Sequence, residues 1–195
     1  MAAPVIYLAS RSPRRRELLN QIGVPHVLVD VEIDETPHPN EPADDFVMRM
    51  ALEKARAGAA SLAHIDLPVL AADTDVVIDE QILGKPTDEQ DAVDMLLRLS
   101  GRAHRVLSAV ALVWKGEEQS LLCESRVHFR KLNEADIRAY WRSGEPADKA
   151  GAYGIQGLGA TFVEYLEGSY SGVMGLPLFE TATLLHNAGL PVVDY

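Results

Sequence analysis

The chain has 195 residues, of which 47% are hydrophobic, so it can bury a substantial core as one domain or as two closely joined lobes. Its formal net charge of -11 argues against general nucleic-acid binding, which needs a broad basic surface to displace counterions. A single cysteine, Cys123, excludes an internal disulfide and fits a reducing cytosol. The sequence has no apolar window as long as a signal peptide or a membrane span, so we expect a cytoplasmic protein without a membrane segment.

Apolar runs alternate with stripes of apolar residues at helical spacing along most of the chain. The runs predict strands at residues 4–9, 26–31, 69–78, 104–114, 119–130 and 160–166. The stripes predict a helix that begins after Ser12 and further helices at residues 42–62, 88–99, 133–143 and 177–188. This alternation indicates an α/β fold, and the short link between strands 104–114 and 119–130 predicts an antiparallel hairpin. We therefore expect a mixed sheet with flanking helices in a single domain over residues 1–195.

The first chemical feature is a group of arginines around the start of the helix that follows strand 4–9. Ser12 is a candidate N-cap, and Pro13 suits the first helical position. The arginines are Arg11, Arg14, Arg15 and Arg16. Free backbone N–H groups, serine hydroxyls and guanidinium groups would converge there, which predicts a site for a phosphate-sized anion. The alternative is an exposed helix start with solvated arginines.

Acidic residues supply the second feature. Residues 31–45 carry six acids, among them Glu35, and no lysine or arginine. A basic cluster beside an acidic one suits a metal-bound polyphosphate, although acidic runs are more often solvated loops. Within strand 69–78, Asp73 and Asp75 should share one face while Thr74 points the other way. Buried carboxylates need a cation, an arginine or solvent, so this pair favours metal binding or general-base chemistry over a structural ion pair.

Two glycine-containing segments follow. In Leu83-Gly84-Lys85-Pro86 the glycine and proline hold the lysine in a defined direction, but the spacing is not that of a P-loop. The run from Asp148 to Gly159 contains four glycines, which would let the backbone approach a ligand, and Gln156 could read a base edge with its amide. Taken alone, this run is also consistent with a flexible loop.

These segments together resemble the Maf family of nucleoside triphosphate pyrophosphatases, in order over nearly the whole chain. The matching motifs are Leu8-Ala9-Ser10, Ser12-Pro13-Arg14-Arg15, Glu53-Lys54-Ala55, Ala72-Asp73-Thr74, Gly84-Lys85-Pro86, Ser100-Gly101, the run from Asp148 to Gly157, and Gly175-Leu176-Pro177. Residues 151–157 resemble the branch that acts on dTTP and UTP. The resemblance implies two lobes around a deep cleft, similar to inosine triphosphate pyrophosphatases, together with a divalent metal, Mg²⁺ or Mn²⁺, and a homodimer.

The resemblance also implies a role for individual residues. The triphosphate would be held by Ser12, Arg14 and Arg15, with Lys54 and Lys85 reaching into the same cleft as catalytic residues that neutralise the leaving group. Asp73 would be the catalytic acid side chain, which binds metal or activates water, and Glu35 would assist in the metal environment. Gln156 would help to select the base.

Three positions depart from the family pattern. Asp75 stands where an apolar residue is expected, which could alter metal binding. The turn Asp79-Glu80 lacks the usual glycine, so we expect a different turn type in a surface hairpin. Ser108 replaces a common threonine and keeps the hydroxyl.

The expected activity is hydrolysis of a nucleoside triphosphate, with dTTP and UTP preferred, to the monophosphate and pyrophosphate by metal-assisted attack of water. One alternative is a regulatory nucleotide-binding protein linked to cell division, which would retain the nucleotide without releasing pyrophosphate. Another is a nonspecific phosphatase, which would release orthophosphate.

Overall fold

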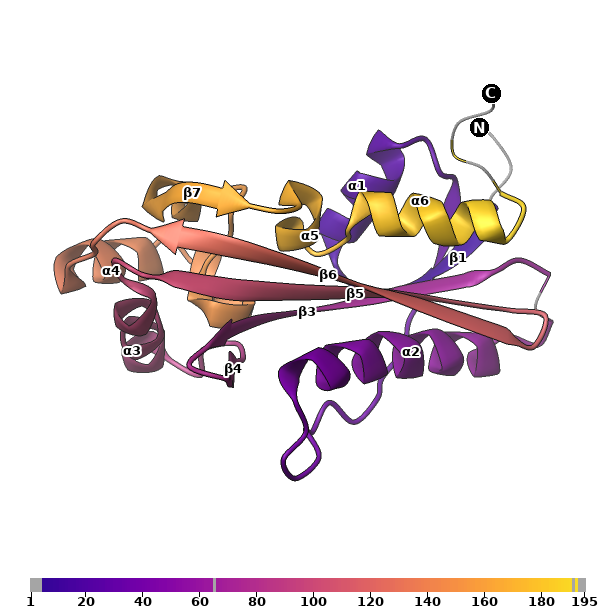
Figure 1. Ribbon diagram of the computed structural model, residues 1–195, viewed down its shortest axis with the longest axis horizontal. Helices are drawn as coiled ribbons and strands as arrows, with labels where there is room; N and C mark the ends of the chain where they lie inside the picture. The colour runs from indigo at the N-terminus through magenta and orange to yellow at the C-terminus, as the bar shows by residue number, and fades with distance from the viewer. Residues whose placement is uncertain (1–4, 65, 191, 193–195) are drawn as a thin grey trace.

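The structure is a computed structural model that describes residues 5–64, 66–190 and 192. A seven-stranded mixed sheet forms the centre of the molecule (Figure 1). The strands run β1 (Ile6–Ala9), β2 (His26–Val29), β3 (Val69–Ile78), β4 (Gln81–Leu83), β5 (Ala103–Trp114), β6 (Glu117–Phe129) and β7 (Val163–Glu167). Their order in the sheet is β2-β1-β3-β5-β6-β7, with β4 paired to β3. Strand β1 pairs in parallel with β2 and β3, and the remaining pairs are antiparallel. The predicted mixed α/β sheet is confirmed.

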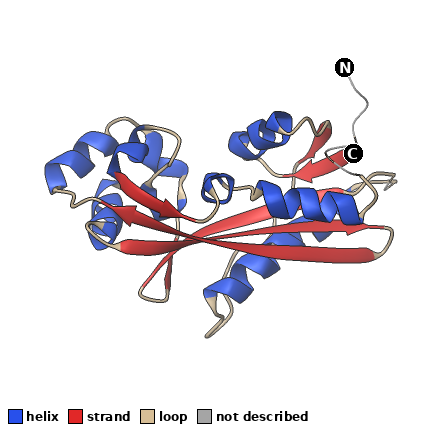
Figure 2. Cartoon of the chain, turned by 45° about the horizontal axis from the view of Figure 1, so that its top comes forward, coloured by secondary structure: helices blue, strands red, loops and turns tan. Residues whose placement is uncertain are grey.

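Helices cover both faces of this sheet (Figure 2). They are α1 (Pro13–Gln21), α2 (Ala43–Ser61), α3 (Glu89–Leu99), α4 (Glu134–Trp141), α5 (Tyr170–Met174) and α6 (Leu178–Asn187). Three short 3-10 helices, η1 (Glu145–Asp148), η2 (Ala150–Ala152) and η3 (Leu158–Phe162), lie between α4 and β7. The starts of α3 and α4 follow from their caps, because the Asp88 and Asn133 side chains each accept a hydrogen bond from a backbone N–H group of the first turn.

Three long strands, β3, β5 and β6, connect the two ends of the molecule (Figure 1). At one end, α3 and α4 pack on these strands through a cluster that includes Val76, Leu96, Phe129 and Ile137. At the other end, α2 packs on one face through alanines and Val47, while α1 and α6 pack on the opposite face through Leu18 and Leu184. Among the described residues, no helix combines the length and hydropathy needed to cross a membrane.

The observed elements differ from the predicted ones at a few places. The strand predicted at residues 4–9 begins on residue 4, which lies outside the described residues, and the observed β1 starts at Ile6. The strand predicted at residues 160–166 begins only at Val163, because η3 occupies the preceding residues. The sequence pattern does not predict β4 or α5, since three and five residues give too little periodicity to detect.

Two hairpin turns bear on the sequence predictions. The β5–β6 hairpin is confirmed, and Trp114 pairs with Glu117 across a two-residue turn. The turn between β3 and β4 has positive φ at both Asp79 (51°) and Glu80 (58°). The expectation of a different turn type at this position is therefore wrong: Glu80 takes the left-handed conformation that glycine would adopt with less strain.

Candidate functional site

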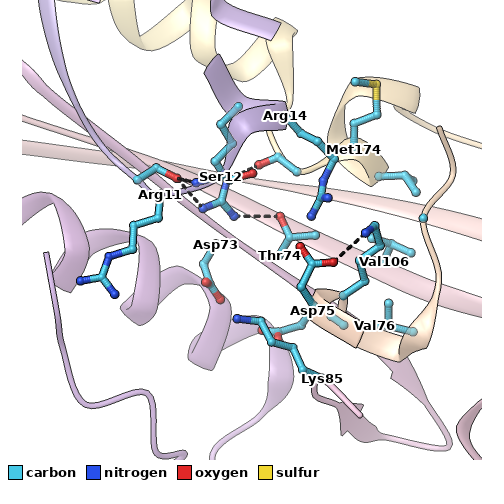
Figure 3. Close-up of a pocket in the computed structure, with 18 of the residues that line it drawn as sticks. Arg11, Ser12, Arg14, Asp73, Thr74, Asp75, Val76, Lys85, Val106 and Met174 are labelled. Atoms are coloured by element: carbon cyan, nitrogen blue, oxygen red, sulfur yellow. Dashed lines mark hydrogen bonds and ion pairs between the residues drawn. The ribbon is translucent and has the colours of Figure 1, made fainter. Parts of the chain in front are cut away.

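A cleft of about 950 Å³ lies between the two ends of the molecule, and Figure 3 shows side chains that line it. Its walls come from the start of α1, the loop before α2, α2 itself, β3, the turn after β4, and the segment between α4 and η3. Every residue predicted to bind substrate or metal lines it: Ser12, Arg14, Arg15, Glu35, Lys54, Asp73, Lys85 and Gln156. The fold thus brings together residues separated by more than half of the chain.

Arg15 is fixed at the base of the cleft by three contacts. Its Nε donates to the Gly175 carbonyl oxygen at 2.7 Å, and its Nη1 donates to Ser10 Oγ at 3.3 Å. Its Nη2 lies 3.5 Å from Thr74 Oγ1, at the limit of a hydrogen bond. Burial lowers the pKa of Arg15 from its ordinary value, yet a guanidinium starts so far above neutrality that it keeps its charge. A fixed, half-buried positive charge therefore faces the cleft.

The other arginines of the α1 start do not converge on one point. Arg11 is paired with Asp30 and with Glu32, the latter at 2.9 Å, and is exposed at the rim. Arg16 is exposed and does not line the cleft. Within the described part of the chain, no hydrogen bond or ion pair engages the Arg14 side chain, which lines the cleft. Arg14 is therefore the guanidinium with donors left for a ligand.

Ser12 occupies the N-cap position of α1 but does not act as a side-chain cap. Its backbone N–H donates to Ser10 Oγ at 3.2 Å, and its own hydroxyl makes no capping hydrogen bond. The first turn of α1 also contains no acidic side chain. Backbone N–H groups and the Ser12 hydroxyl at this helix start can therefore bind an anion.

Lys54 joins two carboxylates on the α2 side of the cleft. Its Nζ lies 2.7 Å from Asp73 Oδ1 on β3 and 2.7 Å from Glu35 Oε1 in the loop before α2. Burial opposes ionisation of Glu35, but the hydrogen bond and charge of Lys54, together with Lys85 and Arg15, hold its pKa below the ordinary value. Glu35 is thus ionised, and each member of this cluster is held by a side chain of another member.

Asp75 lies on the same face of β3 as Asp73, as the alternation predicts. Neighbouring residues of that face, Val69, Ala71 and Val77, pack with α2, whereas Thr74 on the other face contacts Ser108 Oγ at 3.0 Å. Asp75 is buried, and its Oδ2 has no hydrogen-bond partner among the described residues. Burial, followed by the charge of Asp73, raises the pKa of Asp75 to about 8. Asp75 is therefore mainly protonated at neutral pH.

Lys85 and Gln156 lie on exposed segments of the cleft wall. Lys85 follows Gly84, whose carbonyl oxygen accepts a hydrogen bond from Gly151 N at 3.0 Å. This bond ties the lysine turn to the glycine-containing segment that carries Gln156, so the two predicted ligand-binding segments are neighbours.

Two further residues of the cleft, Lys149 and Glu145, were not among the site residues predicted from the sequence. Lys149 Nζ lies 2.7 Å from Asp148 Oδ1 and 2.7 Å from the Glu145 carbonyl oxygen. Glu145 itself lines the cleft and binds backbone of residues 158 and 159. Lys149 belongs to the segment singled out for its glycines, and Glu145 lies three residues before that segment begins. Nothing in their local spacing distinguishes the two residues from solvated charges.

The carboxylates of the cleft have the chemistry of ligands for a divalent cation. No group of three or more His, Cys, Asp or Glu side chains forms a metal cluster within the residues that the structure describes. Mg²⁺ in phosphate-binding sites is held by only one or two carboxylates together with substrate phosphates and water. Glu35 and Asp73 supply such oxygens around Lys54. The donor set fits a cation that binds together with a polyphosphate.

A cationic helix start and a carboxylate cluster in one cleft define a class of proteins that bind polyphosphates. The family model described as "Maf-like protein" matches residues 5–188, so the chain belongs to the Maf family.

Curated relatives support this membership over nearly the full length. A protein of Aromatoleum aromaticum is 54% identical over 96% of this chain and 97% of its own length. A protein of Alkalilimnicola ehrlichii is 56% identical over 93% of this chain and 92% of its own length. Both are named dTTP/UTP pyrophosphatase. The solved Ham1 protein of Staphylococcus aureus is a more distant likeness, 14% identical with a TM-score of 0.46, over 64% of this chain and 71% of its own. The family model and the close relatives, rather than this likeness, establish the family.

Proposed function

We propose that the protein hydrolyses dTTP and UTP to the nucleoside monophosphate and pyrophosphate. The observation that carries the proposal is the Asp73–Lys54–Glu35 cluster, which shares one cleft with the cationic start of α1. The relatives named dTTP/UTP pyrophosphatase support the same substrates.

The cations bind and orient the triphosphate. Among the residues that the structure describes, no side chain or backbone group occupies the donors of Arg14, while Arg15 presents a fixed, half-buried charge. The helix start with Ser12 adds neutral donors. Guanidinium groups bind phosphate oxygens in a bidentate manner, which restricts orientation as well as position. Lys54 and Lys85 neutralise the charge that develops on the departing pyrophosphate.

Asp73 is the proposed catalytic base. Its Oδ1 forms an ion pair with Lys54, and its carboxylate is mostly buried. The contact holds the carboxylate in place, so Asp73 can accept a proton from water with little change in position. A divalent cation, Mg²⁺ or Mn²⁺, held by Asp73 and Glu35 would polarise a phosphoryl oxygen and lower the pKa of bound water. Gln156, exposed on the opposite wall, is the proposed reader of the base, because an amide offers both a donor and an acceptor to a pyrimidine edge.

A nucleotide panel with identification of products by mass tests this proposal. We expect kcat/KM for dTTP and UTP to exceed that for ATP and GTP at least tenfold, about 1.4 kcal/mol of differential transition-state binding. Equal turnover of purine nucleotides would contradict the substrate assignment. Release of orthophosphate would indicate a phosphatase, and retention of dTTP without pyrophosphate release would indicate a regulatory binding protein.

We also propose that the protein is a cytoplasmic homodimer whose chain forms a single domain. This proposal rests on the family and on the sequence. Light scattering coupled to size-exclusion chromatography should give twice the chain mass of 21.3 kDa. Calorimetric unfolding should show one cooperative transition, since β3, β5 and β6 are shared by both ends of the molecule.

A further inference from the structure

The segment that carries Gln156 is held by one pair of side chains from the end of the molecule that contains α4. Glu145 Oε1 accepts hydrogen bonds from the Tyr140 hydroxyl at 2.6 Å and from Gly159 N at 3.1 Å. Glu145 Oε2 accepts from Leu158 N at 2.8 Å. The Tyr140 hydroxyl in turn accepts from Gly154 N at 3.0 Å. Backbone on both sides of Gln156 is therefore fixed by Tyr140 and Glu145.

The glycines of this segment make room for the Glu145 carboxylate. A Cβ atom at Gly157 would lie 2.1 Å from Glu145 Oε2, and one at Gly159 would lie 2.7 Å from the Tyr140 hydroxyl oxygen. Neither position tolerates a side chain without displacing this pair. The sequence suggested that these glycines let the backbone approach a ligand, but at these two positions the backbone closes around a carboxylate of the protein itself.

The ionised carboxylate suits this task better than any neutral side chain. Burial opposes ionisation of Glu145, but hydrogen bonds from Tyr140, Gly159 and Leu158 outweigh it and hold its pKa below the ordinary value. An ionised carboxylate only accepts hydrogen bonds, and all three partners donate. A glutamine at this position would direct an NH₂ group at a donor and lose at least one of the bonds.

We propose that Glu145, acting with Tyr140, is a positioning residue that orients the Gln156 segment and thereby sets the selectivity among nucleobases. The proposal rests on the proposed function, in which Gln156 reads the base. Because the Gln156 side chain is exposed, the backbone that carries it must supply its orientation. The proposed function places the triphosphate at Arg14, Arg15 and the start of α1, so its binding should not depend on this pair.

Glu145→Gln and Tyr140→Phe test the proposal by steady-state kinetics with dTTP, UTP and ATP. We expect KM for dTTP and UTP to rise about 5- to 20-fold with kcat changed less than about threefold, as for a loss of uniform binding. The kcat/KM for ATP should change less than about twofold. Inorganic tripolyphosphate, which has no base, should inhibit the variants and the wild type with the same inhibition constant.

A matched control is Glu134→Gln on α4. Glu134 is an exposed carboxylate whose contact is Arg138 on the same helix, so the same chemical change should leave every parameter unaltered. The double variant Glu145→Gln/Gln156→Ala gives a second readout. If Glu145 acts through Gln156, adding Glu145→Gln to Gln156→Ala should lower the preference for dTTP over ATP no further.

The results separate this inference from the proposed function. A wild type that does not prefer dTTP, or releases no pyrophosphate, overturns both. A wild type that prefers dTTP, with Glu145→Gln retaining the same preference, overturns the positioning role alone. Equal losses for dTTP, ATP and tripolyphosphate binding would also overturn it, since they indicate a general structural role. Should Glu145→Gln fail to fold, the same criteria apply to Tyr140→Phe, which removes only the hydroxyl.

Discussion

The two walls of the cleft hold their carboxylates in different ways. On the first, the β3 wall, the carboxylates of Glu35 and Asp73 contact the ammonium group of Lys54. On the second, the opposite wall, the Glu145 carboxylate accepts hydrogen bonds from backbone N–H groups and from Tyr140. Side-chain partners can turn toward a substrate and exchange one contact for another. Backbone partners can move only if the segment itself moves. The comparison suggests that the first wall carries out the chemistry and that the second fixes the geometry of recognition.

The largest expected effect comes from Asp73→Asn, which tests the chemical role of the first wall. The substitution keeps the shape but removes the basic oxygen, so we expect kcat to fall about a hundredfold or more, at least about 2.7 kcal/mol in activation free energy. Nucleotide binding, measured by calorimetry, should remain detectable. A fully active variant would show that Asp73 has no catalytic role.

The pH dependence of stability tests how closely the second wall is packed around His104. The Nε2 atom of His104 lies 2.8 Å from the hydroxyl of Tyr153 in that wall. Burial, and to a smaller degree His128, lowers the pKa of His104 to about 3. The unfolded chain binds a proton below about pH 6.5 while the folded protein does not, so stability should fall as pH falls from about 6.5 toward 3.

His104→Gln should therefore flatten the acid limb of the stability profile. Between pH 6.5 and pH 4, the wild type should lose about 3 kcal/mol more unfolding free energy than this variant. Urea denaturation at several pH values measures the difference. The exposed His38→Gln should retain the wild-type slope, and a His104→Gln profile parallel to the wild type would contradict the assigned cause.

Arg14 and Arg15 sharpen the distinction between a free ligand-binding group and a fixed one. Arg14→Ala should raise KM about tenfold, roughly 1.4 kcal/mol, with an unchanged melting temperature. Arg15→Ala should weaken binding and also lower the unfolding free energy by about 1–2 kcal/mol, because it leaves the Gly175 carbonyl and other buried acceptors without their donor. Equal melting temperatures for the two variants would contradict this distinction.

The smallest effect is expected at Glu80, in the hairpin that connects β3 to the lysine turn. Glycine adopts the observed φ of 58° without strain, so Glu80→Gly should raise the unfolding free energy by about 0.5 kcal/mol after its own entropic cost. Differential scanning calorimetry measures the gain. Activity should be unchanged, and a loss of activity would show that this turn affects the orientation of Lys85.

Local patterns were sufficient to predict most elements and, through the family motifs, the residues that line the cleft. The helices predicted at residues 88–99 and 133–143 are observed as α3 and α4, and the period of two placed both aspartates of β3 on one face. Such features depend on residues close in sequence, and their physical causes act over a turn or a few strand positions.

Contacts between distant residues could not be predicted in the same way. Arg15 binds the carbonyl oxygen of Gly175, 160 positions away. Arg11 forms ion pairs with Asp30 and Glu32 in the loop after β2. The glycines at positions 157 and 159 predicted that the backbone approaches a ligand, whereas in the structure Gly157 lies beside Glu145 and Gly159 lies beside Tyr140. Whether a glycine admits a ligand or a neighbouring carboxylate depends on the tertiary arrangement, which local spacing does not encode.

The β5–β6 ladder pairs Ala103 with His128 at one end and Trp114 with Glu117 at the other, without a register shift between them. Hinge motion requires a few residues that absorb large changes in backbone angles, and a continuous ladder that reaches both ends of the molecule opposes such changes. The cleft should therefore keep its width when empty, and motion should be confined to its loops. Amide protons at the centre of β5, around Ala109, should consequently be among the slowest to exchange with solvent, whether or not a nucleotide is bound.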